Sequence, residues 1–173
     1  MGTTPTTSVL LTFMVFTPTI GLGLILALLA AQPATKMGKL VLDQAARIIA
    51  LGAGAIVLVL ALVLYAGFDG TRTDAQFVHH AVWIQSFNIE YFLGVDGVSV
   101  SMIILTALVS LIAVGASWNI TKYLKGYFAM FLLLETGMMG VFCALDFFLF
   151  YVFWEVMLLP MYFLIGIWGG PRK

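Results

Sequence analysis

The sequence predicts an all-α membrane protein with about five transmembrane helices, because of its composition and its long apolar runs. Of its 173 residues, 62% are hydrophobic and only 9% carry a charge. A soluble domain is usually about half apolar and about a quarter charged. Most of this chain must therefore face lipid or other membrane helices, and we expect a single membrane domain over residues 1–173.

Each apolar run is long enough to cross a hydrocarbon layer about 30 Å thick, since a helix rises about 1.5 Å per residue. The first run contains Pro18, which a membrane helix tolerates as a kink when neighbouring groups satisfy the freed carbonyl. No basic residue precedes this run, so we expect a retained span and not a cleaved signal peptide. The predicted helices cover about residues 8–31, 48–66, 97–118, 126–144 and 147–168.

Two polar segments interrupt the apolar pattern before the third helix. Residues 32–47 are expected to form a short polar loop, and residues 67–96 form the one substantial loop outside the membrane. In the long loop, the strand-like runs VWIQSF and IEYFLG lie on either side of Asn88 and predict a short hairpin. Asp96 and Asp146 each precede an apolar run, where an N-cap residue is expected.

The basic residues predict an orientation. Seven of the eight Lys and Arg residues lie in 32–47, in 119–125 and at the C-terminus, which share one side of the membrane in this topology. Only Arg72 lies on the other side. The positive-inside rule makes the first side cytoplasmic, so the N-terminus, the loop 67–96 and the turn at Asp146 are expected outside. The balanced net charge gives no reason to expect a nucleic-acid partner.

Two carboxylates stand inside the predicted spans. Glu155 is near the middle of the run 147–168, where a charge costs at least about 2.5 kcal/mol and needs a partner, water or a proton. Glu135 and Glu155 are each ten residues from Leu145, so on antiparallel helices both lie about 15 Å below the same helix ends. If they face one another, they should share a proton. Helix rotation decides this, and the sequence does not determine it.

Pro160 is the predicted break in the same helix. It cannot bond to the carbonyl of Val156, so it should leave a kink and an acceptor that water can reach beside Glu155. We therefore predict Glu155 as a proton-relay residue and Glu135 as a secondary one. The alternative is that both carboxylates only specify helix pairing. Asp146 is a helix cap or the point where protons would enter the relay.

No feature indicates a self-contained enzyme or a cofactor site. The single Cys143 rules out a disulfide or a cysteine-ligated metal within the chain. The adjacent His79 and His80 would point apart on a strand or helix, so we expect a solvated loop there and no metal site. The sequence also has no phosphate-binding loop and no nucleophile motif.

Two stretches carry a resemblance to a known family, LGVDGVSV and ETGMMGVFCALDFFLFYVFWEVMLLPMYFLIGIWGG. They closely resemble the antiporter-like M subunit of the proton-pumping NADH-quinone oxidoreductase, respiratory complex I, called chain 4 in mitochondria. The resemblance implies a multi-pass subunit of the bacterial inner membrane that supplies part of a proton channel. Its partners would be the other membrane subunits and the bilayer, with FMN, iron-sulfur clusters and quinone on other subunits.

The resemblance also assigns roles to the carboxylates. In the family, the glutamate that Glu155 matches pairs with a lysine on the seventh helix, and Glu135 matches a carboxylate seen in many members. Family members have about fourteen membrane helices, so we expect this chain to be the N-terminal portion and not to pump alone. Two other functions stay open: a subunit of a multi-subunit cation/proton antiporter, and a structural membrane fragment.

Overall fold

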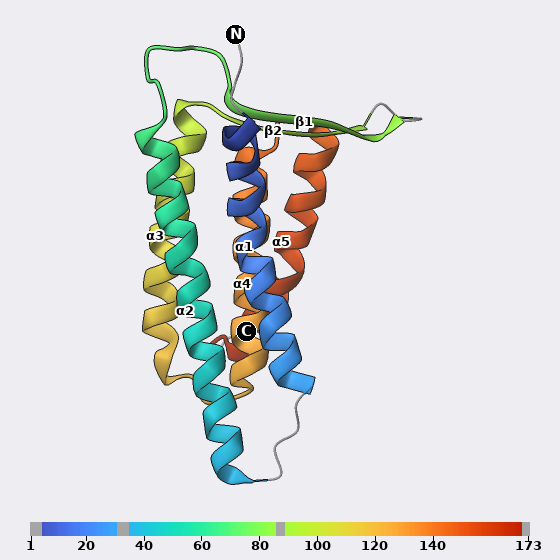
Figure 1. The fold of residues 1–173 in the computed structure, drawn as a ribbon. Helices are drawn as coiled ribbons and strands as arrows, with labels where there is room; N and C mark the ends of the chain where they lie inside the picture. The colour runs from blue at the N-terminus through green and yellow to red at the C-terminus, as the bar shows by residue number, and fades with distance from the viewer. Residues whose placement is uncertain (1–4, 31–34, 86–88, 171–173) are drawn as a thin grey trace.

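The protein is a bundle of long helices capped at one end by a two-stranded hairpin (Figure 1). The structure, a computed structural model, describes residues 5–30, 35–85 and 89–170, with side chains from residue 9 onward. In these ranges, five helices are long and apolar enough to cross a membrane, which confirms the predicted fold class. The helices are α1 (Pro5–Ala30), α2 (Lys36–Ala66), α3 (Gly97–Ala116), α4 (Leu124–Cys143) and α5 (Phe147–Trp168).

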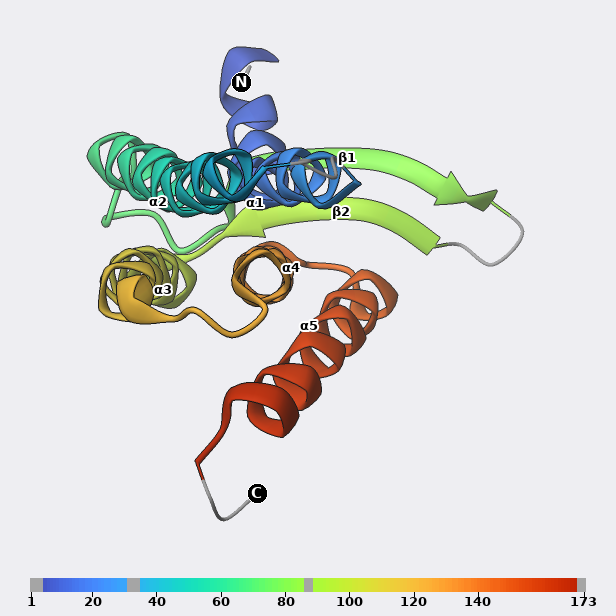
Figure 2. The same cartoon turned by 90° about the horizontal axis from the view of Figure 1, so that it is seen from below.

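Helix α4 occupies the centre of the bundle. Seen along the helices, it lies between α1, α3 and α5, and it packs most extensively against α1 and α5 (Figure 2). Of its most apolar stretch, 56% of the residues are buried, against 17% for α5. Helix α5 packs mainly on α4, with a smaller contact to the hairpin, so most of its surface faces outward.

The predicted hairpin is present. Strand β1 (Gln76–Ile84) pairs antiparallel with β2 (Ile89–Val95), and the pair extends past α5 at one end of the bundle (Figure 1). Strand β1 begins earlier than the expected VWIQSF run because Gln76 is anchored. Its amide group donates to the Asp69 carbonyl over 2.7 Å and accepts from the Asp69 N–H over 3.0 Å. The expected turn residue, Asn88, lies outside the described residues.

The prediction of a polar loop over residues 32–47 is wrong from residue 36 onward, because this part of the chain is helical. Helix α2 begins at Lys36, with Thr35 as its N-cap accepting from the Gly38 N–H over 3.2 Å. The charged residues from Lys36 to Arg47 recur every three or four positions, which places them along one helix face and lets the helix continue. At 31 residues α2 is about 46 Å long, so it exceeds the thickness of the hydrocarbon layer.

The other helix boundaries agree with the predicted ranges to within about three residues. Both predicted caps are also present. Asp96 accepts from the Ser99 N–H over 2.7 Å at the start of α3, and Asp146 accepts from the Leu149 N–H over 2.8 Å at the start of α5. The four hydrogen-bond donors at each helix start need such acceptors, which explains why Asp occupies both positions.

Candidate intramembrane carboxylate site

Glu135 is fully buried in the middle of α4. Within the described part of the chain, neither of its carboxylate oxygens has a hydrogen-bond partner. Leu132 and Met139 lie on the same α4 face, one turn before and one turn after it, and they belong to two different apolar clusters. Both clusters are completed by residues of α1, α2 and α3. Glu135 therefore interrupts the apolar interior of the bundle where the two clusters meet.

Glu155 has a different environment, because it lies on the exposed surface of α5. It lines a groove of about 710 Å³ together with Leu133 of α4 and several residues of α5, including Tyr162. Tyr151, one helical turn earlier, interacts with its carboxylate. The residues that line this groove include no Lys or Arg. A cation for Glu155 would therefore have to come from outside the groove lining.

The contact between α4 and α5 answers the question of whether the two carboxylates face one another. A Cβ atom on Gly137 would lie only 2.9 Å from Cβ of Met157 and 3.0 Å from its backbone, so the two helices touch at this point. Glu135 precedes Gly137 by two residues, and Glu155 precedes Met157 by two residues. Two residues correspond to a rotation of about 200° around a helix. Because α4 and α5 run antiparallel, these steps lead in opposite directions along the bundle, so the carboxylates lie about 6 Å, or one helical turn, apart and not at the same depth as predicted. Each carboxylate points away from the other helix, so the two do not face one another.

Pro160 does not end α5, which continues as one helix to Trp168. The proline therefore removes one backbone hydrogen bond within a continuous helix, which agrees with the predicted helix range 147–168. The residue whose carbonyl it cannot bond, Val156, lines the Glu155 groove on one side and a second cavity on the other. Whether water reaches this carbonyl remains a prediction.

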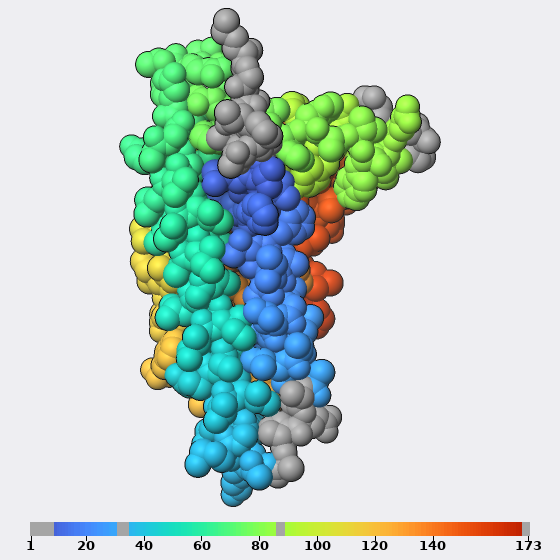
Figure 3. Space-filling model, in the orientation of Figure 1, coloured from blue at the N-terminus to red at the C-terminus, as the bar shows by residue number. Residues whose placement is uncertain are grey.

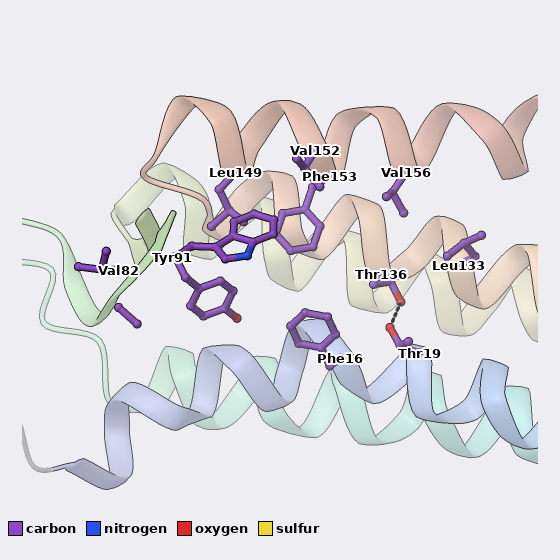
Figure 4. A pocket seen from close by; sticks show the side chains of 12 residues that line it. Phe16, Thr19, Val82, Tyr91, Leu133, Thr136, Leu149, Val152, Phe153 and Val156 are labelled. Atoms are coloured by element: carbon purple, nitrogen blue, oxygen red, sulfur yellow. Dashed lines mark hydrogen bonds between the residues drawn. The ribbon is translucent and has the colours of Figure 1, made fainter. Parts of the chain in front are cut away.

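The second cavity, of about 520 Å³, lies between α1, α4 and α5 beside the hairpin (Figure 4). Its walls are apolar except for a few hydroxyl groups. Thr19 of α1 and Thr136 of α4 are hydrogen-bonded over 2.9 Å, and the Thr136 hydroxyl also donates to the Leu132 carbonyl over 3.0 Å. Sequence reasoning missed this pair, because Thr19 is one of several threonines in the first apolar run and nothing in the sequence relates it to Thr136.

Comparison with known proteins identifies the family. The family described as NADH-ubiquinone oxidoreductase chain 4, amino terminus, matches residues 74–144. NADH-quinone oxidoreductase subunit M of Rhodobacter capsulatus is 40% identical over 131 residues, which are 76% of this chain and 25% of the relative. Its counterpart in Rickettsia typhi is 32% identical over 165 residues, 95% of this chain and 33% of the relative. The chain belongs to this subunit M/chain 4 family.

The relationship reaches plants as well as bacteria. NADH-ubiquinone oxidoreductase chain 4 of Arabidopsis thaliana is 40% identical over 128 residues, 73% of this chain and 26% of the relative. The chain thus spans between a quarter and a third of the length of these subunit M/chain 4 proteins. The range matched by the family description contains Glu135 and ends before Glu155.

Proposed function

We propose that this chain supplies part of a proton channel in the membrane domain of a NADH-quinone oxidoreductase, through Glu155 and Glu135. The observation that supports the proposal most is that both carboxylates lie near the middle of neighbouring membrane helices, on either side of the α4–α5 contact. Intramembrane ionisable groups are costly and usually functional. The names of the related proteins supply the complex in which such a channel would work.

The two carboxylates would have different roles. Glu155 stands in an open groove beside Tyr151, where it can exchange a proton with water or with a cation brought by another part of the assembly. Glu135 is enclosed by apolar side chains, where an unpaired anion is strongly disfavoured, so it would hold its proton except when a partner or water approaches. The nearest polar neighbour along the chain is Thr136, whose hydroxyl is already engaged.

Asp146 stands at the end of α5 nearest the hairpin. One of its carboxylate oxygens holds the Leu149 N–H as a cap. The other oxygen would be the point where protons enter from the side of the hairpin. The orientation implied by the basic residues makes this the outer side of a bacterial inner membrane.

The proteins that assemble with this chain distinguish a subunit of NADH-quinone oxidoreductase from a subunit of a cation/proton antiporter. An affinity-tagged chain expressed from its own genome should co-purify with flavin-containing and iron-sulfur-containing subunits, detected by their absorbance and by mass spectrometry. Recovery with other membrane subunits alone, and with no redox subunit, would favour the cation/proton antiporter.

Replacement of the buried carboxylate tests the structural alternative. Glu135→Leu removes an unsatisfied buried polar group, so the free energy of unfolding should stay constant or rise by about 1–3 kcal/mol. Proton translocation by the complex should nevertheless fall, because leucine carries no proton. The measurements are unfolding in mixed micelles and proton uptake by membrane vesicles. Met139→Leu, on the same face of α4, serves as the control and should alter neither. A loss of stability or assembly in Glu135→Leu with normal pumping per assembled complex would support a purely structural role.

A further inference from the structure

A basic cavity lies at the end of the bundle opposite the hairpin, away from both carboxylates. It encloses about 780 Å³ between the first turns of α2 and the connection from α3 to α4. A second cavity of about 340 Å³ adjoins it and shares part of its wall, including Lys39 and Asp43. The protruding first turns of α2 that border these cavities are visible at the lower end of the space-filling view (Figure 3).

The walls of the two cavities carry an excess of positive charge. Lys36, Lys39, Arg47 and Lys125 line them, against the single carboxylate of Asp43. Lys125 Nζ lies 3.9 Å from Asp43 Oδ1 and already balances that charge. Across the described ranges, no carboxylate lies within ion-pair distance of Lys36 or Lys39. Three positive charges are therefore left to face the cavities.

Arg47 adds an unused donor. Its terminal nitrogens donate to the Gln44 side chain and to the Ile120 carbonyl, each over 3.3 Å, and its guanidinium lies 5.8 Å from the ring centre of Trp118. These contacts hold the side chain in place. Its Nε is buried and has no acceptor among the described residues. A buried donor left without an acceptor costs about 1–3 kcal/mol, so an acceptor from a bound anion would be favourable.

Large apolar side chains stand beside these cations on the surface of α2. Met37, Leu40 and Val41 are 71%, 65% and 60% exposed, and the last two also line the larger cavity. A small soluble anion would gain no favourable contact with these apolar side chains. A ligand with an anionic head and hydrocarbon chains matches both features. Because α2 is longer than the hydrocarbon layer, its first turns fall at the membrane interface, where lipid headgroups lie.

We propose that this cavity binds the phosphate headgroup of an anionic phospholipid. The phosphate would sit against Lys36, Lys39 and Arg47, and the acyl chains would run along Leu40 and Val41. Basic pockets between membrane helices on the positively charged face are typical sites for such lipids. The proposal is independent of proton translocation, since neither Glu135 nor Glu155 takes part in it.

The test uses the purified chain in detergent and native mass spectrometry with phosphatidylglycerol or phosphatidylcholine of identical acyl chains. Phosphatidylglycerol should bind at least about fivefold more tightly, and Lys39→Gln should weaken it about fivefold, because one lysine near the headgroup contributes about 1 kcal/mol. Lys122→Gln is the matched control. It removes the same charge at the same end of the bundle, but Lys122 lines neither cavity and donates to the Ile167 carbonyl.

Three results would overturn the proposal. The first is equal binding of the two lipids. The second is an equal loss in Lys39→Gln and Lys122→Gln, which would indicate general surface attraction. The third is binding of inorganic phosphate as tight as that of phosphatidylglycerol, which would indicate a site for free phosphate. Circular dichroism of each variant establishes that the helices are intact before binding is compared.

Discussion

Glu155→Gln is expected to abolish redox-linked proton translocation by the complex that contains this chain, while assembly of the complex survives. Glutamine has nearly the same shape as glutamate, but its side-chain amide does not release or accept a proton at physiological pH. The side chain is exposed in its groove, so its replacement removes no core packing. Proton uptake by inverted membrane vesicles should fall by about a hundredfold or more, since a positioned proton-transfer group typically contributes about a hundredfold to ten-thousandfold.

Two companion variants sharpen this result. Glu155→Asp keeps the carboxyl group one methylene further back and should retain part of the activity. Tyr162→Phe alters the same groove without touching a carboxylate and should leave translocation unchanged. Near-normal pumping in Glu155→Gln would refute the relay role. Loss of the assembled complex in that variant, with turnover unchanged in the complex that remains, would instead support a residue that guides assembly.

Gly137→Ala should destabilise the protein by about 1–3 kcal/mol, the usual cost of overpacking a tight interior. The added methyl group would meet the backbone of Met157 at 3.0 Å, and backbone atoms cannot turn aside as a flexible side chain can. Helix α5 would then have to move away from α4. The free energy of unfolding, measured in mixed micelles, checks this expectation.

A second glycine supplies the control for that measurement. A Cβ added at Gly23 of α1 meets nothing within 4 Å, so Gly23→Ala should be neutral or stabilise by up to about 1 kcal/mol through reduced flexibility of the unfolded chain. If both variants changed stability equally, helix propensity would explain the effect and the close contact would not. A shift of α5 in Gly137→Ala should also reduce proton translocation, because the groove of Glu155 includes Leu133 of α4.

Residues 36–47 show where sequence reasoning fell short. Their charged side chains indicated a loop, because charges are rare in membrane spans. Charge by itself does not end a helix, however. Thr35 caps the segment, and the charged residues recur with helical spacing, so α2 extends beyond the hydrocarbon layer. The periodicity was available in the sequence, and the composition of the segment obscured it.

The residues of the basic cavity were beyond sequence prediction for a different reason. Arg47 and Ile120 are 73 residues apart, yet the guanidinium donates to the Ile120 carbonyl. Lys125 likewise donates to the carbonyl of Leu28 over 3.3 Å, from another helix. No local pattern relates these residues. Only the packing of α1, α2 and α4 brings their groups to one end of the bundle.

The sequence by itself determined where the helices lie, apart from the start of α2, and placed both carboxylates near the middle of their spans. In hydrocarbon the backbone must satisfy its own hydrogen bonds, so long apolar runs become helices, and residue counts then give depth to within about one turn. Only the tertiary structure decided which way Glu135 and Glu155 point. That direction depends on helix rotation, which the close contact between Gly137 and Met157 establishes by steric fit across two helices. The same contact leaves one carboxylate enclosed in the bundle and the other open to a partner.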